Sequence, residues 1–74
     1  MNYYLIIINE TVCRRIVHYR NKCNLTREDL ASNVGVNLKH LISIEAGSRI
    51  PRISELVQLA AGLGVSINDL VNNE

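Results

Sequence analysis

The sequence predicts an all-α fold of five short helices preceded by a short β-strand, in a chain of 74 residues. Three observations predict it. Apolar residues recur every three or four positions along most of the chain, polar residues able to cap a helix precede several of these stretches, and glycines follow them. A chain of this length makes one domain, with residues 10–74 as the helical part and residues 1–9 as an N-terminal arm.

The arm contains the apolar run "NYYLIII", whose aromatic and β-branched residues favour a strand. Alternation leaves both faces of that strand apolar, so it needs cover on both sides. We expect it to pair with the same strand of a second copy and form a homodimer. The alternative, that the run extends the next helix, stays open because β-branched residues do not exclude helix. The expected dimerisation residues are Tyr3, Tyr4, Leu5, Ile6, Ile7 and Ile8.

The first helix is predicted over residues 10–22 by a stripe of apolar positions with helical spacing. The stripe consists of Val12, Ile16, Tyr19 and Cys23. Basic side chains occupy the opposite face, namely Arg14, Arg15, His18 and Lys22. We therefore expect one face of this helix, including Cys23, to lie in the core.

Three later helices are predicted to begin at Thr26, Asn37 and Ser66. Each of these residues can accept a hydrogen bond from a free amide of the first helical turn, and each has an apolar residue before it and another four positions after it. The helices that begin at Thr26 and Asn37 should span residues 26–33 and 37–46. A further helix should run from about Ile53 to Gly62, because apolar residues again recur there with helical spacing.

Positive charge is concentrated in the middle of the chain. All eight lysines and arginines lie between Arg14 and Arg52, where only three acidic residues stand, so this segment carries 8 − 3 = +5 although the whole chain carries +1. Such a distribution suits a surface that binds a polyanion. An ordinary solvated surface would also account for it.

The turn "VGV" joins residues 26–33 to residues 37–46, and a short glycine-containing turn between two helices is typical of a helix-turn-helix. Residues 25–70, "LTREDLASNVGVNLKHLISIEAGSRIPRISELVQLAAGLGVSINDL", resemble the Cro/C1 repressor family, also called the XRE family. The resemblance extends to small phage-like repressors and restriction-modification controller proteins. It implies a five-helix, lambda-repressor-like DNA-binding domain, and hence double-stranded DNA as a partner.

The resemblance also implies roles for individual residues. It places Thr26 and Arg27 beside a DNA phosphate, although the family usually has glutamine at the second position. It places the following residues on or around the side of the third helix that faces the major groove: Asn37, Leu38, Lys39, His40, Ile42 and Ser43. Arg49 and Arg52 would grip the DNA backbone, while Arg20 and Glu45 match a charged pair that is commonly structural in this family.

A helical projection of residues 37–46 supports this division. Leu41 and Ile44 point about opposite to Lys39, so we expect both in the core. Leu38 and Ile42 would then border the outer face, where an apolar side chain can touch a thymine methyl. They could instead form a patch that binds protein, as in a toxin-binding antitoxin. The main prediction is a sequence-specific transcription regulator that binds an operator as a homodimer.

Other classes of function find little support in the sequence. Cys13, His18 and Cys23 are spaced by five residues, so they project about 140° apart around a helix and cannot converge on a metal ion. No arrangement of a nucleophile with a base, paired carboxylates or a phosphate-binding loop predicts an enzyme or a cofactor. The aromatic residues needed to stack RNA bases are scarce. Free cysteines and the lack of a signal peptide or membrane-length apolar run predict a cytoplasmic protein.

Overall fold

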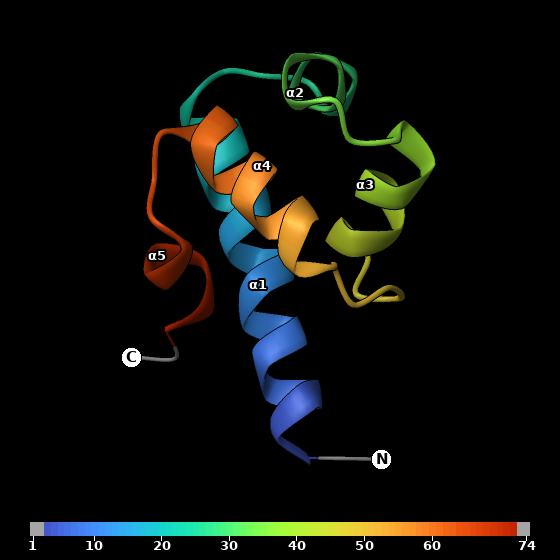
Figure 1. Cartoon of the computed structure of the whole chain (residues 1–74), viewed down its shortest axis with the longest axis vertical. Coiled ribbons are helices and arrows are strands. Elements are labelled where there is room, and N and C mark those ends of the chain that lie inside the picture. Colours follow the sequence, from blue (N-terminus) through green and yellow to red (C-terminus); the bar gives the residue numbers. More distant parts are fainter. Residues whose placement is uncertain (1–2, 73–74) are drawn as a thin grey trace.

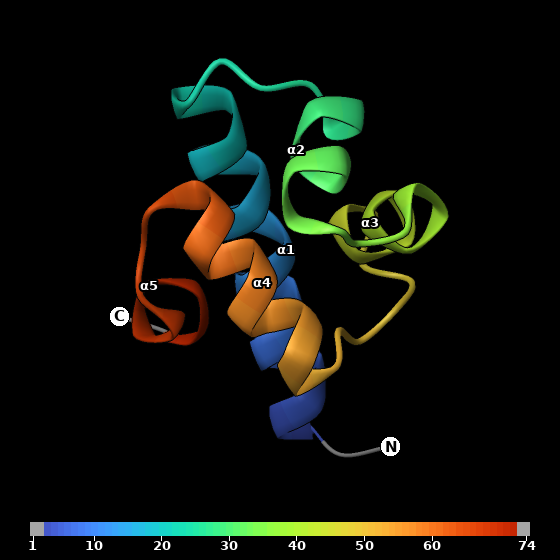
Figure 2. The same ribbon diagram turned by 45° about the horizontal axis from the view of Figure 1, so that its top comes forward.

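The computed structural model describes residues 3–72, with side chains over residues 9–72. Five helices make up this part of the chain: α1 (Tyr3–Lys22), α2 (Arg27–Val34), α3 (Leu38–Glu45), α4 (Ile53–Leu63) and α5 (Ile67–Val71). Helix α1 runs through the length of the molecule, with α4 packed across it and α3 and α5 on opposite sides (Figures 1 and 2). The predicted all-α architecture of five helices is confirmed.

The predicted N-terminal strand is wrong. The backbone of Tyr3, Tyr4, Leu5, Ile6, Ile7 and Ile8 is helical, so α1 begins seven residues before the predicted start at residue 10. A helix satisfies its amides and carbonyls within one segment, whereas a strand without a neighbour leaves them unpaired, and the lower helix propensity of isoleucine costs less than about 0.7 kcal/mol per residue. Only the backbone of these six residues is described, so the side-chain contacts on which the predicted dimer depends lie outside the described part of the chain.

The core contains fully buried side chains from all five helices. Val12, Ile16, Leu30, Leu41, Ile44, Leu59 and Leu70 are each at most 1% exposed. The predicted burial of Leu41 and Ile44 is confirmed, and with it the orientation of α3. Cys23 is exposed, contrary to the prediction, because α1 ends at Lys22 and the chain turns there. Within residues 3–72, no helix is both long enough and apolar enough to cross a membrane.

The predicted caps set the helix boundaries. The hydroxyl of Thr26 accepts a hydrogen bond from the amide of Asp29 at 3.0 Å, and the Asp29 carboxylate accepts one from the Thr26 amide at 3.2 Å. Ser66 and Asp69 form the same reciprocal pair at the start of α5. Because the capping residues stand just outside the helical turns, each helix begins one residue after its cap. Helix α2 ends at Val34 and is followed by its C-cap Gly35, whose φ of +74° suits glycine.

A glycine also brings α2 close to α4. Gly62 lies within α4, and a Cβ atom added there would overlap Cγ1 of Val34 at the end of α2. Without a side chain at Gly62, the two helices approach closely enough to pack. Helix α2 contacts both α4 and α3, so the close approach at Gly62 helps to place the two helices of the helix-turn-helix on the rest of the bundle.

Candidate nucleic-acid interface

Helix α3 has one buried and one exposed face. Leu41 and Ile44 are completely buried, whereas Leu38 is 36% exposed and Ile42 is 44% exposed. Lys39 is also exposed, and Ser43 is partly buried. The outer face of α3 therefore presents two aliphatic side chains around a lysine. Helix α3 itself lies on the side of the bundle away from α5 (Figures 1 and 2).

The start of α3 is fixed by Asn37. Its side-chain oxygen accepts hydrogen bonds from the amides of Lys39 at 2.9 Å and His40 at 3.3 Å. The Asn37 oxygen is therefore engaged in capping, as the hydroxyl of Thr26 is at the start of α2. Both residues were predicted on the DNA-facing surface, and the structure shows that their side chains also hold the first turns of the two helices in place.

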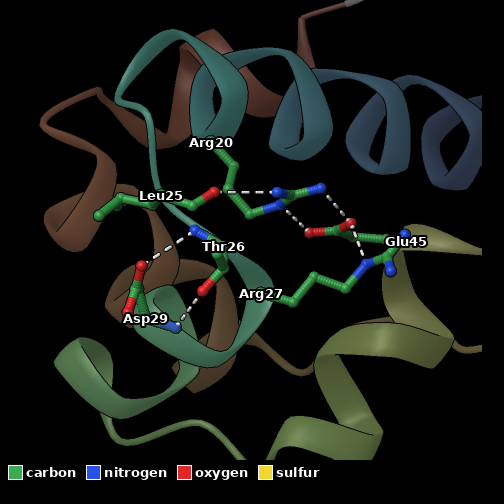
Figure 3. Close-up of polar contacts among 6 residues, drawn as sticks. All are labelled: Arg20, Leu25, Thr26, Arg27, Asp29 and Glu45. Atoms are coloured by element: carbon green, nitrogen blue, oxygen red, sulfur yellow. Dashed lines mark hydrogen bonds and ion pairs between the residues drawn. The ribbon is translucent and has the colours of Figure 1, made fainter.

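Glu45, at the end of α3, binds two arginines (Figure 3). The guanidinium of Arg20 donates from Nε to Glu45 Oε2 at 2.8 Å and from Nη2 to Oε1 at 3.1 Å. Its Nη1 donates to the carbonyl of Leu25 at 3.0 Å. Arg27 donates from Nε to Glu45 Oε1 at 2.9 Å. We call these three residues, Arg20, Arg27 and Glu45, the Glu45 cluster.

The members of the Glu45 cluster differ in their exposure to solvent. The Glu45 side chain is 2% exposed and that of Arg20 is 11% exposed, whereas that of Arg27 is 48% exposed. Arg20 is therefore committed to the interior, between α1, the turn at Leu25 and α3. Arg27 reaches the same carboxylate from the first turn of α2 and remains open to solvent.

A second carboxylate, Glu55 in the first turn of α4, lies near two more residues of the predicted surface. Its Oε2 lies 3.4 Å from Nδ1 of His40, and its Oε1 lies 3.5 Å from Nη2 of Arg49. Oε1 also accepts a hydrogen bond from the amide of Arg52 at 2.8 Å. We call His40, Arg49 and Glu55 the Glu55 cluster. It joins α3, the turn after α3 and α4.

The pKa of Glu55 lies below its ordinary value. Burial by itself would raise the pKa, but the hydrogen bond from the Arg52 amide and the positive charges of Arg49 and His40 together outweigh it. Glu55 is therefore held as a carboxylate. Glu55 was not predicted from the sequence, although an acid three positions after a helix cap is a recognisable signal, because Arg52 is not a residue type that usually caps helices.

The turn between α3 and α4 is held by one side chain from α1 and one from the turn itself. Asn9 of α1 donates from its side-chain amide to the carbonyl of Gly47 at 2.9 Å, and the hydroxyl of Ser48 donates to the carbonyl of Ser43 at 3.2 Å. The turn carries Arg49, which is partly buried, and leads to Arg52, which is exposed. Asn9 was not predicted as part of the site, since it lies far from the turn in sequence.

The predicted site residues thus fall into three groups. Arg27 and Thr26 lie at the start of α2, the residues of α3 lie in the middle, and Arg49 and Arg52 follow at the start of α4. Arg20 is set apart from them by its burial. Among residues 3–72, no three His, Cys, Asp or Glu side chains are grouped so that they could hold a metal ion.

Comparison with known proteins agrees with this geometry. A helix-turn-helix family model matches residues 16–70. An uncharacterized HTH-type transcriptional regulator of Methanocaldococcus jannaschii is 38% identical over 56 residues, which cover 76% of this chain and 85% of that protein. The cryptic phage CTXphi transcriptional repressor RstR of Vibrio cholerae is 30% identical over 56 residues, covering 76% of this chain and 50% of that protein. No solved structure gives a significant match.

Proposed function

Because the chain belongs to the helix-turn-helix family of the Cro/C1 (XRE) type, we propose that it is a sequence-specific DNA-binding transcription regulator that inserts α3 into the major groove of an operator. The observation that carries the proposal is the exposed face of α3, which lies between two groups of cationic side chains at the starts of α2 and α4. The concentration of positive charge in the middle of the chain supports it.

In this proposal the exposed face of α3 reads the base edges. Lys39 can donate to guanine and Ser43 can donate or accept, while Leu38 and Ile42 suit thymine methyl groups. Asn37 and His40 lie at the start of the same helix, where the first contacts of a recognition helix are usually made. We therefore expect a site with thymines opposite the aliphatic pair.

The groups at either end of α3 would hold the DNA backbone. Thr26 and Arg27 start α2 on one side, and Arg49 and Arg52 flank the start of α4 on the other. Guanidinium groups and helix amides both bind phosphate oxygens well, and such contacts fix the register of the protein without reading sequence.

Selection of bound sequences from a pool of random duplexes tests the proposal. A consensus should emerge, and binding to it should weaken steeply as salt rises. Lys39→Ala or Ser43→Ala should relax preference at one position by about 1 to 3 kcal/mol, whereas Arg49→Ala should weaken all sequences alike. Lys22→Ala, at the end of α1, serves as the control. Failure to recover any consensus would contradict the proposal.

A protein partner is the second candidate function, favoured by the exposure of Leu38 and Ile42 on one face. A toxin-binding antitoxin would use such an apolar pair. Replacing both residues by serine separates the two functions. In a DNA reader the change alters base preference and leaves phosphate contacts intact, whereas in a protein-binding module it abolishes the complex with the partner.

We further propose that the chain binds its operator as a homodimer, because one helix-turn-helix covers half of a palindromic site and two copies must lie about 34 Å apart. The first turns of α1 support this assignment, since their backbone extends beyond the other helices (Figure 1) and their sequence is apolar. Sedimentation of the full chain and of a chain lacking residues 1–8 tests it. A truncated chain that remains dimeric would place the interface elsewhere.

A further inference from the structure

The Glu45 cluster has a property that a purely structural ion pair does not need. One buried carboxylate is shared by an arginine of the interior and an arginine of the surface, and both bond to Glu45 Oε1, at 3.1 Å and 2.9 Å. Figure 3 shows the two guanidinium groups on the same carboxylate, one reaching it from α1 and the other from α2. The Arg20 contacts already satisfy both oxygens, so the bond to Arg27 is additional.

We propose that Glu45 is a positioning residue for DNA binding, which holds the guanidinium of Arg27 so that its terminal nitrogens face a phosphate of the operator. This inference rests on the function proposed above. Arg27 uses its Nε for Glu45, and within the described part of the chain its Nη1 and Nη2 have no hydrogen-bond or ion-pair partner. Two such nitrogens can donate side by side to the oxygens of one phosphate.

Holding Arg27 before DNA arrives lowers the entropic cost of the contact. A free arginine side chain loses much of its rotamer freedom when it is fixed on a ligand, and a side chain already fixed by a neighbour loses less. The holding group is itself rigid, because Arg20 binds both oxygens of Glu45 and also the carbonyl of Leu25. Arg27 is thus supported by three elements of the fold, namely α1, the turn before α2 and α3.

The charges of the cluster permit a phosphate to approach. Two arginines and one glutamate leave a net charge of 2 − 1 = +1, and the exposed member is a cation. The Glu45 carboxylate is buried, whereas the Arg27 side chain that bonds to it is about half exposed to solvent. A phosphate can therefore bind Nη1 and Nη2 of Arg27 while Nε of Arg27 keeps its hydrogen bond to Glu45.

Arginine should be required at position 27. Lysine carries its three donors on one nitrogen, so it cannot bond to Glu45 and to a phosphate through separate nitrogens. We expect Arg27→Gln to weaken operator binding roughly tenfold, with base preference unchanged and the slope of log affinity against log salt reduced by about 1. Arg27→Lys should lose much of the same affinity although it keeps the charge. The matched control is Arg14→Lys, in an exposed arginine of α1 that has no ion pair in the described chain and lies outside the proposed DNA-binding residues. It should change affinity less than about twofold.

A double-mutant cycle then tests Glu45 itself, with Glu45→Gln measured in the wild-type chain and in Arg27→Gln, below the unfolding temperature of every variant. A positioning role predicts that Glu45→Gln weakens operator binding in the wild-type chain and has little further effect in Arg27→Gln. A merely structural role predicts the same loss in both and would overturn the inference. If Glu45→Gln does not fold, the comparison of Arg27→Lys with Arg14→Lys decides.

The outcomes separate this inference from the proposed function. A wild-type chain that selects no duplex sequence contradicts DNA recognition as a whole. A wild-type chain that binds its selected operator, with Arg27→Lys equally tight, contradicts the positioning role and leaves DNA recognition standing. Equal affinity of Arg27→Gln and wild type would likewise overturn the positioning role, because Arg27 would then make no phosphate contact.

Discussion

The Glu45 and Glu55 clusters each join a buried carboxylate to two basic side chains, but their contacts differ. Glu45 makes three contacts with arginine nitrogens between 2.8 and 3.1 Å. Glu55 makes its shortest contact, 2.8 Å, with the backbone amide of Arg52, and its contacts with His40 and Arg49 are 3.4 and 3.5 Å. The first cluster is built mainly from ion pairs, and the second mainly from a helix cap.

Because their contacts differ, the two clusters should contribute differently to stability and to its dependence on pH. Arginine stays charged at all accessible pH values, and a carboxylate that binds one guanidinium through two parallel hydrogen bonds is geometrically fixed. A cap with longer ion contacts depends more on the carboxylate remaining ionised. We therefore expect the Glu45 cluster to dominate the stability of the helix-turn-helix and the Glu55 cluster to make a smaller contribution that depends on pH.

The largest effect should follow from Glu45→Ala. Removing the carboxylate leaves the charge of Arg20 buried without its partner, which should lower the free energy of unfolding by about 3 to 5 kcal/mol. Thermal and urea unfolding followed by circular dichroism measure it. Glu28→Ala, in an exposed residue of α2, is the matched control and should change the free energy by less than about 0.5 kcal/mol.

A smaller loss, about 1 to 2 kcal/mol, should follow from Glu55→Ala, because the Arg52 amide loses its acceptor and Arg49 loses its ion pair. The same unfolding measurements apply, with Ser54→Ala in the same turn of α4 as the control. If Glu55→Ala destabilises the chain more than Glu45→Ala does, our ranking of the two clusters is reversed.

Acid should weaken the Glu55 cluster. A carboxylate whose pKa is lowered in the folded state contributes stability that is fully present above its ordinary pKa of 4.5 and is lost as pH falls through the lower, folded value. The free energy of unfolding should therefore decline as pH falls below about 4.5, and Glu55→Gln should reduce this decline. Urea unfolding between about pH 5 and pH 2 measures the difference. An unchanged pH profile in Glu55→Gln would contradict the assignment.

Asp69 provides a reference for that measurement. The hydrogen bond that the Ser66 amide donates to the Asp69 carboxylate, together with the nearby Ser66 hydroxyl, holds the pKa of Asp69 below its ordinary value as well, so the cap of α5 also weakens in acid. Asp69→Asn should therefore remove a separate part of the decline in stability. The two substitutions lie in different helices without a shared partner, so their effects on the pH profile should add.

The fold was largely predictable from the sequence because its signals are local. Helices are capped at Thr26, Asn37 and Ser66 by hydrogen bonds between residues two or three positions apart. Each cap can therefore be recognised from a short stretch of sequence. The start of α1 was not predictable in this way. The run from Tyr3 to Ile8 suits a strand by residue type, although its backbone is helical.

The candidate site was predictable in part. The burial of Leu41 and Ile44 follows from helical spacing, and it fixes the outer face of α3. Contacts between distant residues were not available from such patterns. The Arg27 bond to Glu45 spans 18 residues and the Asn9 bond to Gly47 spans 38, so both depend on how the helices pack. The contact of Glu55 with His40 likewise depends on packing, whereas its contact with the Arg52 amide is local and was missed because arginine seldom caps a helix.

The smallest change in stability should come from the exposed member of each cluster. Arg27 is 48% exposed and His40 is 43% exposed, so solvent screens both ion pairs. Arg27→Gln and His40→Gln should each lower the free energy of unfolding by less than about 1 kcal/mol, since Arg20 still satisfies Glu45 and the Arg52 amide still satisfies Glu55.

Unfolding measurements on Arg27→Gln and His40→Gln test this difference between the clusters. In each cluster, loss of the carboxylate should lower the free energy of unfolding more than loss of the exposed basic side chain does. The difference between the two losses should be larger in the Glu45 cluster. If Arg27→Gln lowers the free energy of unfolding as much as Glu45→Ala does, then Arg27, and not Arg20, makes the ion pair that stabilises the packing of the helices. If the loss is small, any weaker operator binding by Arg27→Gln cannot be attributed to unfolding, and it reports the contact of Arg27 with the DNA backbone.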